Sequence, residues 1–328
     1  MKISNGLLRQ VCNVVPLLLC ASIAGAALAQ SYPNKPIRII VPYPPGGATD
    51  LIGRTIGLKL AEAWTRPVIV DNRGGAEGNI GIGLVAQAVP DGYTLVVVPA
   101  NLAINPSFHR KLSYDPVKDF APITQVTSQA YLFVVHPSVP AKTVKEFIAF
   151  AKSKKDGITY TSSGSGLPPH LGWELLKRLA GFDALHVPYK GTAPSMIALI
   201  AGEADASMVT PPSSLSHVRT GRLRALAVTS LKRSVLLPDV PTVAESGFPG
   251  FEVSGWIGLL APAGTPREVV AKLHNEISRI LKLPDVRDRM VADGVDPVGG
   301  TPEEFEAYIK AEIIKWAKVI KQSGARAD

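Results

Sequence analysis

Two stretches decide the fold, Val41-Pro-Tyr-Pro-Pro-Gly-Gly-Ala-Thr-Asp50 and Ser162-Ser-Gly-Ser-Gly-Leu-Pro-Pro-His170. In each, an extended apolar run leads through a short loop of glycine, proline and small polar residues into an amphipathic helical pattern. We call residues 42–47 the first loop and residues 163–167 the second loop. In open α/β sheets, ligands lie at the carboxyl ends of the strands, where both loops would fall.

Similar runs continue outward in both directions. Their Val and Ile content without strict alternation predicts strands buried on both faces, as in parallel sheets. The expected strands are Ile37–Tyr43, Val68–Asn72, Leu95–Pro99, Leu132–His136, Ile158–Ser162, Leu185–Tyr189, Ala206–Thr210, Leu223–Thr229 and Trp256–Ala261. The 328 residues exceed the size at which one core stops growing, and no Pro/Gly/Ser-rich linker divides them. The sequence therefore predicts an α/β fold of two lobes, between which the chain crosses more than once.

Helix starts are also marked. Three segments have the pattern of a capping box, in which a threonine and a glutamate three residues later satisfy the first helical N–H groups. They begin at Thr143, Thr265 and Thr301, and the last two carry proline at the next position.

The first 29 residues are predicted to be a secretory signal peptide. Lys2 and Arg9 give a positive start, an apolar run follows, and Ala27-Leu-Ala29 is a typical cleavage site. A membrane anchor would need a longer apolar run, and Cys20 follows a leucine rather than the small residue of a lipoprotein signal. We therefore expect cleavage after Ala29, export to the periplasm, and loss of both cysteines with the peptide.

Several functional classes lack their motifs. The sequence has no phosphate-binding P-loop, no nucleophile elbow, no dinucleotide fingerprint and no histidines at metal-ligand spacing. The net charge of +8 comes from scattered lysines and arginines, which does not favour nucleic-acid binding. We expect no cofactor and no metal.

The two loops are the candidate ligand site. Their glycines let backbone N–H groups approach a ligand, and a helix start adds free donors with partial positive charge. Such a site suits a carboxylate and needs no lysine or arginine. The alternative is that both are ordinary turns in which Thr49, Asp50 and Ser165 cap helices.

Weaker candidates lie nearby. His170 could donate to a ligand, or its side chain could simply be solvated. Tyr189 could donate its hydroxyl to a ligand, or it could belong to an ordinary turn. Asp205 could form the far wall of the site or a turn before a strand. Trp256 is expected in the core rather than in the cleft.

At these residues the chain resembles the extracytoplasmic solute receptors of tripartite tricarboxylate transporters, the Bug family. The resemblance covers essentially the whole chain after the signal peptide, and no one motif is decisive. Besides the two loops, it rests on segments that begin at Asn72, Leu112, Val187, Leu237 and Ala261.

The resemblance implies a two-lobe periplasmic-binding-protein fold, with mixed or parallel sheets and a cleft between the lobes, that closes on its ligand. One lobe would comprise residues 30–131 and 255–328, the other residues 132–254. It also implies that backbone amides, hydroxyls and waters between the loops hold a ligand carboxylate. The implied ligand residues, with the neighbouring tyrosines, are Tyr43, Gly46, Gly47, Ala48, Thr49, Asp50, Ser163, Gly164, Ser165, Gly166, His170, Tyr189 and Asp205.

Two departures from the family pattern concern the ligand. Leu167 stands where a small polar residue is frequent, and Val209-Thr-Pro-Pro212 lacks a frequent Phe-Asp type pair. They suggest a less polar acid, aromatic or longer-chained. The implied function is a monomeric receptor that delivers a small carboxylate to integral-membrane transporter subunits. The alternatives are a periplasmic enzyme with His170 and Asp205 as its acid–base pair, and a sensor for a membrane kinase.

Overall fold

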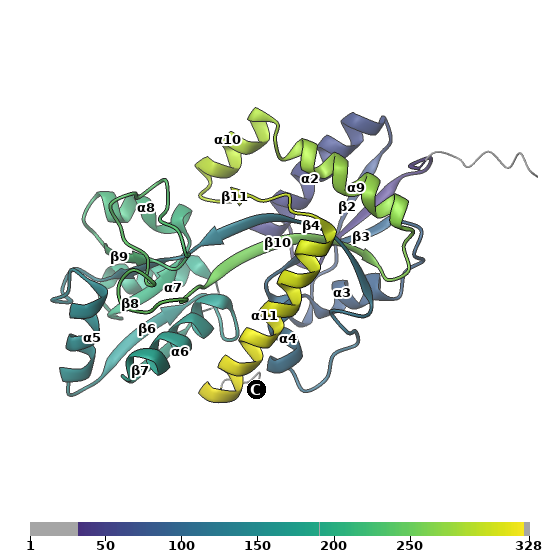
Figure 1. The fold of residues 1–328 in the computed structure, drawn as a ribbon. Coiled ribbons are helices and arrows are strands. Elements are labelled where there is room, and N and C mark those ends of the chain that lie inside the picture. Colours follow the sequence, from purple (N-terminus) through teal and green to yellow (C-terminus); the bar gives the residue numbers. More distant parts are fainter. Residues whose placement is uncertain (1–31, 190, 325–328) are drawn as a thin grey trace, which may run out of the picture.

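The computed structural model describes residues 32–189 and 191–324, so the expected signal peptide and its cleavage site lie outside the described residues. Two lobes lie side by side, joined by the long strands β4 (Phe120–Ala130) and β10 (Ser254–Pro262) (Figure 1). Within the described part of the chain, no helix is long and apolar enough to cross a membrane.

The first lobe is built on a six-stranded mixed sheet of order β11-β4-β10-β3-β1-β2. β1 is parallel to β2 and β3, whereas β10 is antiparallel to β3 and β4. The strands not yet given are β1 (Ile37–Val41), β2 (Val68–Asn72), β3 (Thr94–Pro99) and β11 (Asp296–Pro297).

Helices cover both faces of this sheet. α2 (Ala48–Trp64) and α9 (Arg267–Ile280) pack on one face around a core that includes Ile39 and Leu273. The other face carries three helices and the short turn η1 that precedes them. These are η1 (Ala76–Gly78), α3 (Asn79–Ala86), α4 (Asn101–Phe108) and α11 (Pro302–Ser323). α10 (Pro284–Ala292) follows α9.

The second lobe contains a five-stranded sheet of order β7-β6-β8-β5-β9. β6 is parallel to β7 and β8, and β5 is antiparallel to β8 and β9. The strands are β5 (Leu132–Val135), β6 (Ile158–Ser162), β7 (Ala184–Pro188), β8 (Ala206–Val209) and β9 (Arg224–Val228). The helices are α5 (Val144–Ser153), α6 (Pro168–Ala180), α7 (Thr192–Ala201) and α8 (Pro211–Arg219).

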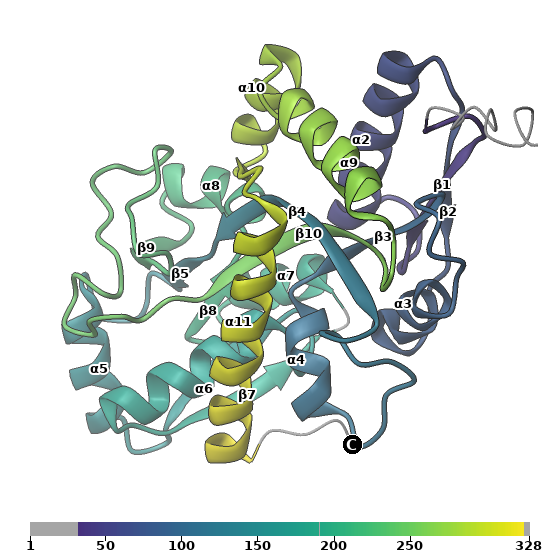
Figure 2. The same ribbon diagram turned by 45° about the vertical axis from the view of Figure 1, so that its right-hand side comes forward.

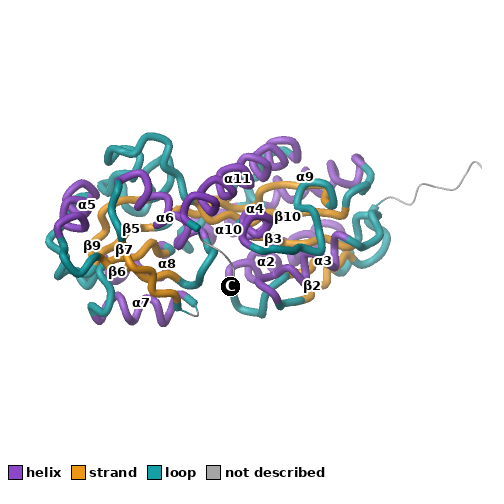
Figure 3. Tube along the Cα trace, turned by 90° about the horizontal axis from the view of Figure 1, so that it is seen from below, coloured by secondary structure: helices purple, strands orange, loops and turns teal. Residues whose placement is uncertain are grey.

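The chain passes to the second sheet between β4 and β5 and returns at β10. The expected lobe boundaries at residues 131 and 255 fall at these two places, and the division itself stays a prediction. α11 runs along α4 in the first lobe and reaches α6 in the second (Figure 2). Seen from below, the two groups of strands remain separate apart from the joining strands (Figure 3).

The α/β prediction is confirmed, and every expected strand is present within two residues of its predicted ends. Both sheets are mixed, in agreement with the mixed or parallel sheets that the resemblance implies. The helix starts at Thr143 and Thr301 are capped as predicted, because each hydroxyl accepts from the N–H three residues later. The prediction at Thr265 is wrong: its hydroxyl donates to the Pro262 carbonyl, and α9 begins at Arg267.

Candidate functional site

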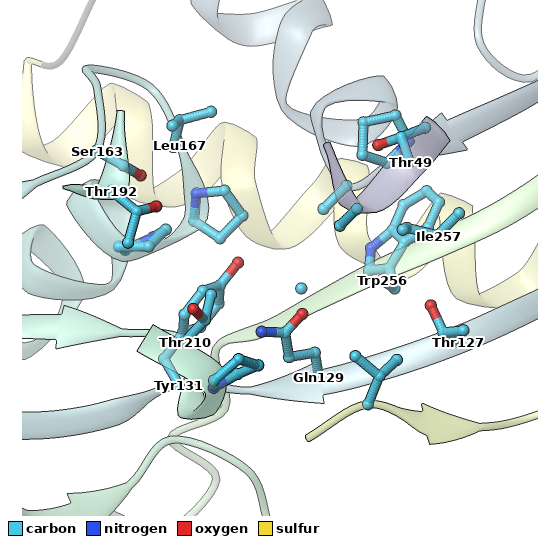
Figure 4. Close-up of a pocket in the computed structure, with 18 of the residues that line it drawn as sticks. Thr49, Thr127, Gln129, Tyr131, Ser163, Leu167, Thr192, Thr210, Trp256 and Ile257 are labelled. Atoms are coloured by element: carbon cyan, nitrogen blue, oxygen red, sulfur yellow. The ribbon is translucent and has the colours of Figure 1, made fainter. Parts of the chain in front are cut away.

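A cavity of about 670 Å³ lies between the two lobes. Five helices begin at its wall: α2 and α4 of the first lobe, and α6, α7 and α8 of the second. The long strands β4 and β10 add Thr127, Gln129, Trp256 and Ile257 (Figure 4). The volume is within the range of small-molecule sites, which run from about 300 to 1,000 Å³.

The starts of these helices differ in the donors that they offer. The first N–H groups of any helix lack partners within the helix and carry partial positive charge. α2 begins with Ala48 and Thr49 after an N-cap, Gly47, whose position supplies no side-chain cap. α6 and α8 begin with Pro168-Pro169 and Pro211-Pro212, and proline has no N–H to donate. Donors therefore come from α2, α4 and α7, while α6 and α8 present apolar rings.

The wall of the cavity carries little charge. Among the described residues that line it, only Arg289 and Asp293 are charged, on the last turn of α10 and directly after it. The polar groups are mainly neutral hydroxyls and amides, including Gln129, Ser163 and Thr210, which Figure 4 shows around the cavity. A small anion could thus be bound by these hydroxyls and amides and by the free N–H groups at the helix starts, as predicted for the two loops.

The first loop is held from behind by Asp50. Its buried carboxylate accepts hydrogen bonds from Gly46 N, Arg54 Nε and Asn72 Nδ2, at 2.9 to 3.0 Å. The hydrogen bond from Arg54 is the main cause that lowers the pKa of Asp50 to about 2. Asn72 Nδ2 also donates to the Tyr43 carbonyl. Asp50 is therefore an ionised brace that fixes the loop ahead of α2.

The second loop is fixed by a glycine and a histidine. Gly166 has a φ of +73°, and it lies against the ring of Phe108 at the end of α4 in the other lobe. Its N–H donates to His170 Nδ1 at 3.0 Å, so this nitrogen of the buried imidazole carries no proton. The loop is thus held both by its own helix and by the opposite lobe.

The predicted site residues in and beside the two loops fall into two groups. Tyr43, Ala48, Thr49 and Ser163 line the cavity. The other predicted residues there do not line it but shape the loops, and the Tyr189 N–H donates to the Ser162 carbonyl. This second group comprises Gly46, Gly47, Asp50, Gly164, Ser165, Gly166, His170 and Tyr189. Ligand contact by each of these residues stays a prediction.

Asp205 lies at the other end of β6. Its carboxylate accepts from Lys154 Nζ at 2.8 Å and from the N–H and hydroxyl of Thr159. Thr159 is at the start of β6, whereas the second loop follows its end. His170 Nδ1 accepts from the Gly166 N–H, and the hydrogen bonds of the Asp205 carboxylate go to Lys154 and Thr159 rather than to His170.

Other lining residues were not predicted from the sequence. Thr127, Gln129 and Tyr131 come from β4 and its end, and β4 itself was not among the expected strands. Asn101 and Thr192 begin helices directly after strands, so the rule that ligands lie at the carboxyl ends of strands could have found them.

Both departures from the family pattern reach the cavity. Leu167, Val209, Thr210 and Pro212 are all part of its wall. Trp256 is only 2% exposed and also lines the cavity, so it belongs to both core and cleft. No cluster of three His, Cys, Asp or Glu side chains that could hold a metal occurs in residues 32–189 and 191–324.

Comparison with known proteins agrees with this geometry. Residues 52–325 match the model of the "Tripartite tricarboxylate transporter family receptor". Protein BugT of Bordetella pertussis is 35% identical over 308 residues, which cover 93% of this chain and 94% of BugT.

Two solved structures share the fold. "R. palustris Rpa4515 with adipate" has a TM-score of 0.77 and 33% identity, over 90% of this chain and 99% of that one. "MatC (Rpa3494) from Rhodopseudomonas palustris with bound malate" has a TM-score of 0.73 and 33% identity, over 88% of this chain and all of that one. The chain belongs to the receptor family of the tripartite tricarboxylate transporters.

Proposed function

We propose that this chain is a periplasmic receptor that captures a small carboxylate between its lobes and delivers it to integral-membrane transporter subunits. The observation that carries the proposal is the convergence of helix starts on a cavity whose wall holds little charge. Partial positive charge and N–H donors can bind a carboxylate there, and among the described residues of the wall Arg289 is the one cationic side chain.

We further propose that the body of the ligand is apolar. Leu167 and Pro168 on one lobe and Trp256 and Ile257 on the joining strand form apolar wall, and Met208 and Val209 extend it. A hydroxyl placed against these side chains would lose its water without gaining a partner, which costs about 1–3 kcal/mol. Adipate in the Rpa4515 structure is an acid with such a body, and malate in MatC is a more polar one.

Two close contacts between the lobes show how capture would work. Gly166 packs on Phe108, and Gly294 of the first lobe packs on Pro211 at the start of α8. A ligand that touches both lobes gains more contacts when the lobes are closed, so its binding shifts the population toward that shape. Membrane subunits would then recognise the closed shape.

This function needs neither catalysis nor a cofactor. We propose a monomer that is exported by a signal peptide cleaved after Ala29. Recovery of the ligand unchanged after binding would support the receptor over an enzyme, whereas turnover would contradict it. A role as sensor for a membrane kinase would be indicated by normal uptake of the ligand in cells that lack the receptor.

The first experiment is a thermal-shift and calorimetric screen of residues 30–328. The panel holds mono-, di- and tricarboxylates, aromatic acids, amino acids and sugars. Binding to the native state raises stability by about 2.7 kcal/mol at a hundredfold excess over Kd. A response confined to carboxylates is expected, and a response to sugars alone would overturn the proposal.

The apolar body is tested by Leu167→Ser. This variant should lose selectivity for aromatic or long-chain acids over hydroxy-diacids of similar size. Leu179→Ser is the matched control, because Leu179 lies on α6, whose N-cap is Leu167, is 46% exposed and does not line the cavity. Unchanged selectivity in Leu167→Ser would count against an apolar body.

A further inference from the structure

A set of stacked aromatic rings lies behind the second loop. The ring of His186 on β7 stacks on that of Tyr160 on β6, with centroids 4.9 Å apart and planes inclined by 17°. The two residues are direct partners in the parallel pairing of these strands. His186 also stacks on His170, at 4.1 Å and 9°, and Tyr160 stacks on Trp173. α6 is therefore attached to the sheet through two stacked pairs.

His186 also holds the start of the second loop. Its Nε2 lies 2.7 Å from Ser162 Oγ. That hydroxyl donates to the Gly164 carbonyl and accepts from the Gly164 N–H. The tautomer of His186 decides whether Nε2 or the Ser162 hydroxyl carries the proton of this contact. With either tautomer, His186 is the side chain that holds this serine.

The end of the loop depends on His186 through His170. The Gly166 N–H donates to His170 Nδ1, and the plane of the His170 ring is set by the stacked His186 ring. The two histidines therefore engage Ser162 before the loop and Gly166 within it. Between these points the loop places Ser163 in the cavity wall, followed by Leu167. His186 itself does not line the cavity.

We propose that His186 is a positioning residue for ligand capture, which holds both ends of the second loop in their binding shape from outside the cavity. This inference rests on the proposed function. It differs from a direct ligand contact because it acts through Ser162 and His170.

The arrangement requires neutral imidazoles. A proton on His170 Nδ1 would face the Gly166 N–H, and two charged rings 4.1 Å apart would repel each other. Burial lowers the pKa of both histidines to about 4. The charged groups beside them are Lys177, which lowers both pKa values, and Glu174, which raises that of His186 and pairs with Lys177 at 2.9 Å. Tyr160, which faces His186, donates its hydroxyl to Glu174.

The test compares His186→Phe with the wild type. Phenylalanine keeps a ring for stacking but cannot form the hydrogen bond between Nε2 and Ser162. We expect roughly tenfold weaker binding of adipate at pH 7, from the loss of one hydrogen bond, with little change in the thermal midpoint. His274→Phe on α9 is the control and should bind normally. Wild-type affinity in His186→Phe would overturn the proposal.

A second measurement needs no ligand and no variant. In NMR spectra recorded from pH 7 to 3.5, the Gly166 amide signal should move as His170 titrates, and the Gly164 amide signal, whose N–H donates to Ser162, should move as His186 titrates. A Gly164 signal that does not follow the titration of the His186 imidazole would overturn the proposal. If wild-type protein does not bind adipate, that result counts against adipate as its ligand, and the NMR titration alone decides the role of His186.

Discussion

Replacing Gly166 by alanine should weaken ligand binding more than it weakens the fold. A Cβ added at Gly166 would lie 2.4 Å from Cε1 and 2.6 Å from Cζ of Phe108, whereas ordinary contacts are 3.4 to 4 Å. The ring and the loop would have to separate by roughly 1 Å. Since Gly166 and Phe108 belong to different lobes, opening of the cavity relieves the overlap.

The cost has two parts. Alanine at a φ of +73° loses about 1 kcal/mol in any state of the lobes. The overlap with Phe108 adds about 1–3 kcal/mol, the range for an overpacked contact, but only when the lobes are closed. A penalty confined to the closed state lowers affinity by roughly 5- to 150-fold. The free energy of unfolding of the ligand-free protein should fall by only about 1 kcal/mol.

Two measurements separate these parts. Calorimetry with a carboxylate ligand measures the loss of affinity, and urea unfolding measures the loss of unfolding free energy. Gly157→Ala is the matched control, because Gly157 has the same φ of +73° and no other atom within 4 Å of an added Cβ. It should lose about 1 kcal/mol of stability and no affinity. Adding Phe108→Ala to Gly166→Ala removes Cε1, Cζ and also Cδ1, which would lie 2.8 Å from the added Cβ, and should restore binding. Affinity that stays low in this double variant would refute the argument from overlap.

Further predictions concern charge and pH. In calorimetry, Arg289→Gln should weaken the binding of acids that carry a second anionic group and leave the binding of monoacids unchanged. The control is Arg287→Gln, on the same helix but outside the cavity wall, which should change neither affinity. Asp205→Asn should cost about 1–3 kcal/mol in urea unfolding with unchanged affinity, and a selective loss of affinity would instead support ligand contact. His170 and His186 are protonated more readily in the unfolded chain, so their contribution to stability is complete above about pH 6.5 and is lost as the pH falls toward 4. The slope is at most about 1.4 kcal/mol per pH unit for each histidine, and equal urea midpoints at pH 7 and pH 5 would contradict it.

The sequence predicted those features that depend on residues close together in the chain. A glycine-rich loop after an apolar run, followed by a helical pattern, predicts a helix start at the end of a strand, and both loops occur there. Strand β4 was not predicted because Pro122 and the polar stretch from Thr124 to Gln129 break the apolar pattern of a strand. In the fold, β10 pairs with β4 along its length. Gln129 and Thr127 were lost from the predicted site for that reason.

Long-range partners could not be read from the sequence. Asp50 has the position of a helix cap, yet its carboxylate joins Gly46 to Asn72 on a neighbouring strand, which only the folded chain reveals. Asp205 is different. It directly precedes β8, and a residue that begins a parallel strand lies at the opposite edge from loops that follow their strands. Chain order alone could therefore have placed Asp205 away from the two loops.

The prolines support the proposed preference for an acid with an apolar body. α2 and α4 of the first lobe begin without proline, so their first N–H groups are available to a carboxylate. α6 and α8 of the second lobe each begin with two prolines, beside Leu167, Met208 and Val209. Closure of the lobes brings both kinds of wall onto one molecule. An acid with a hydroxylated body would gain the donors and lose water from its hydroxyls against the prolines, at about 1–3 kcal/mol for each unpaired group. On this proposal, selectivity comes from the donors that the prolines remove from the starts of α6 and α8, whereas α2, α4 and α7 keep theirs for the carboxylate. An acid with an apolar body fits both kinds of wall.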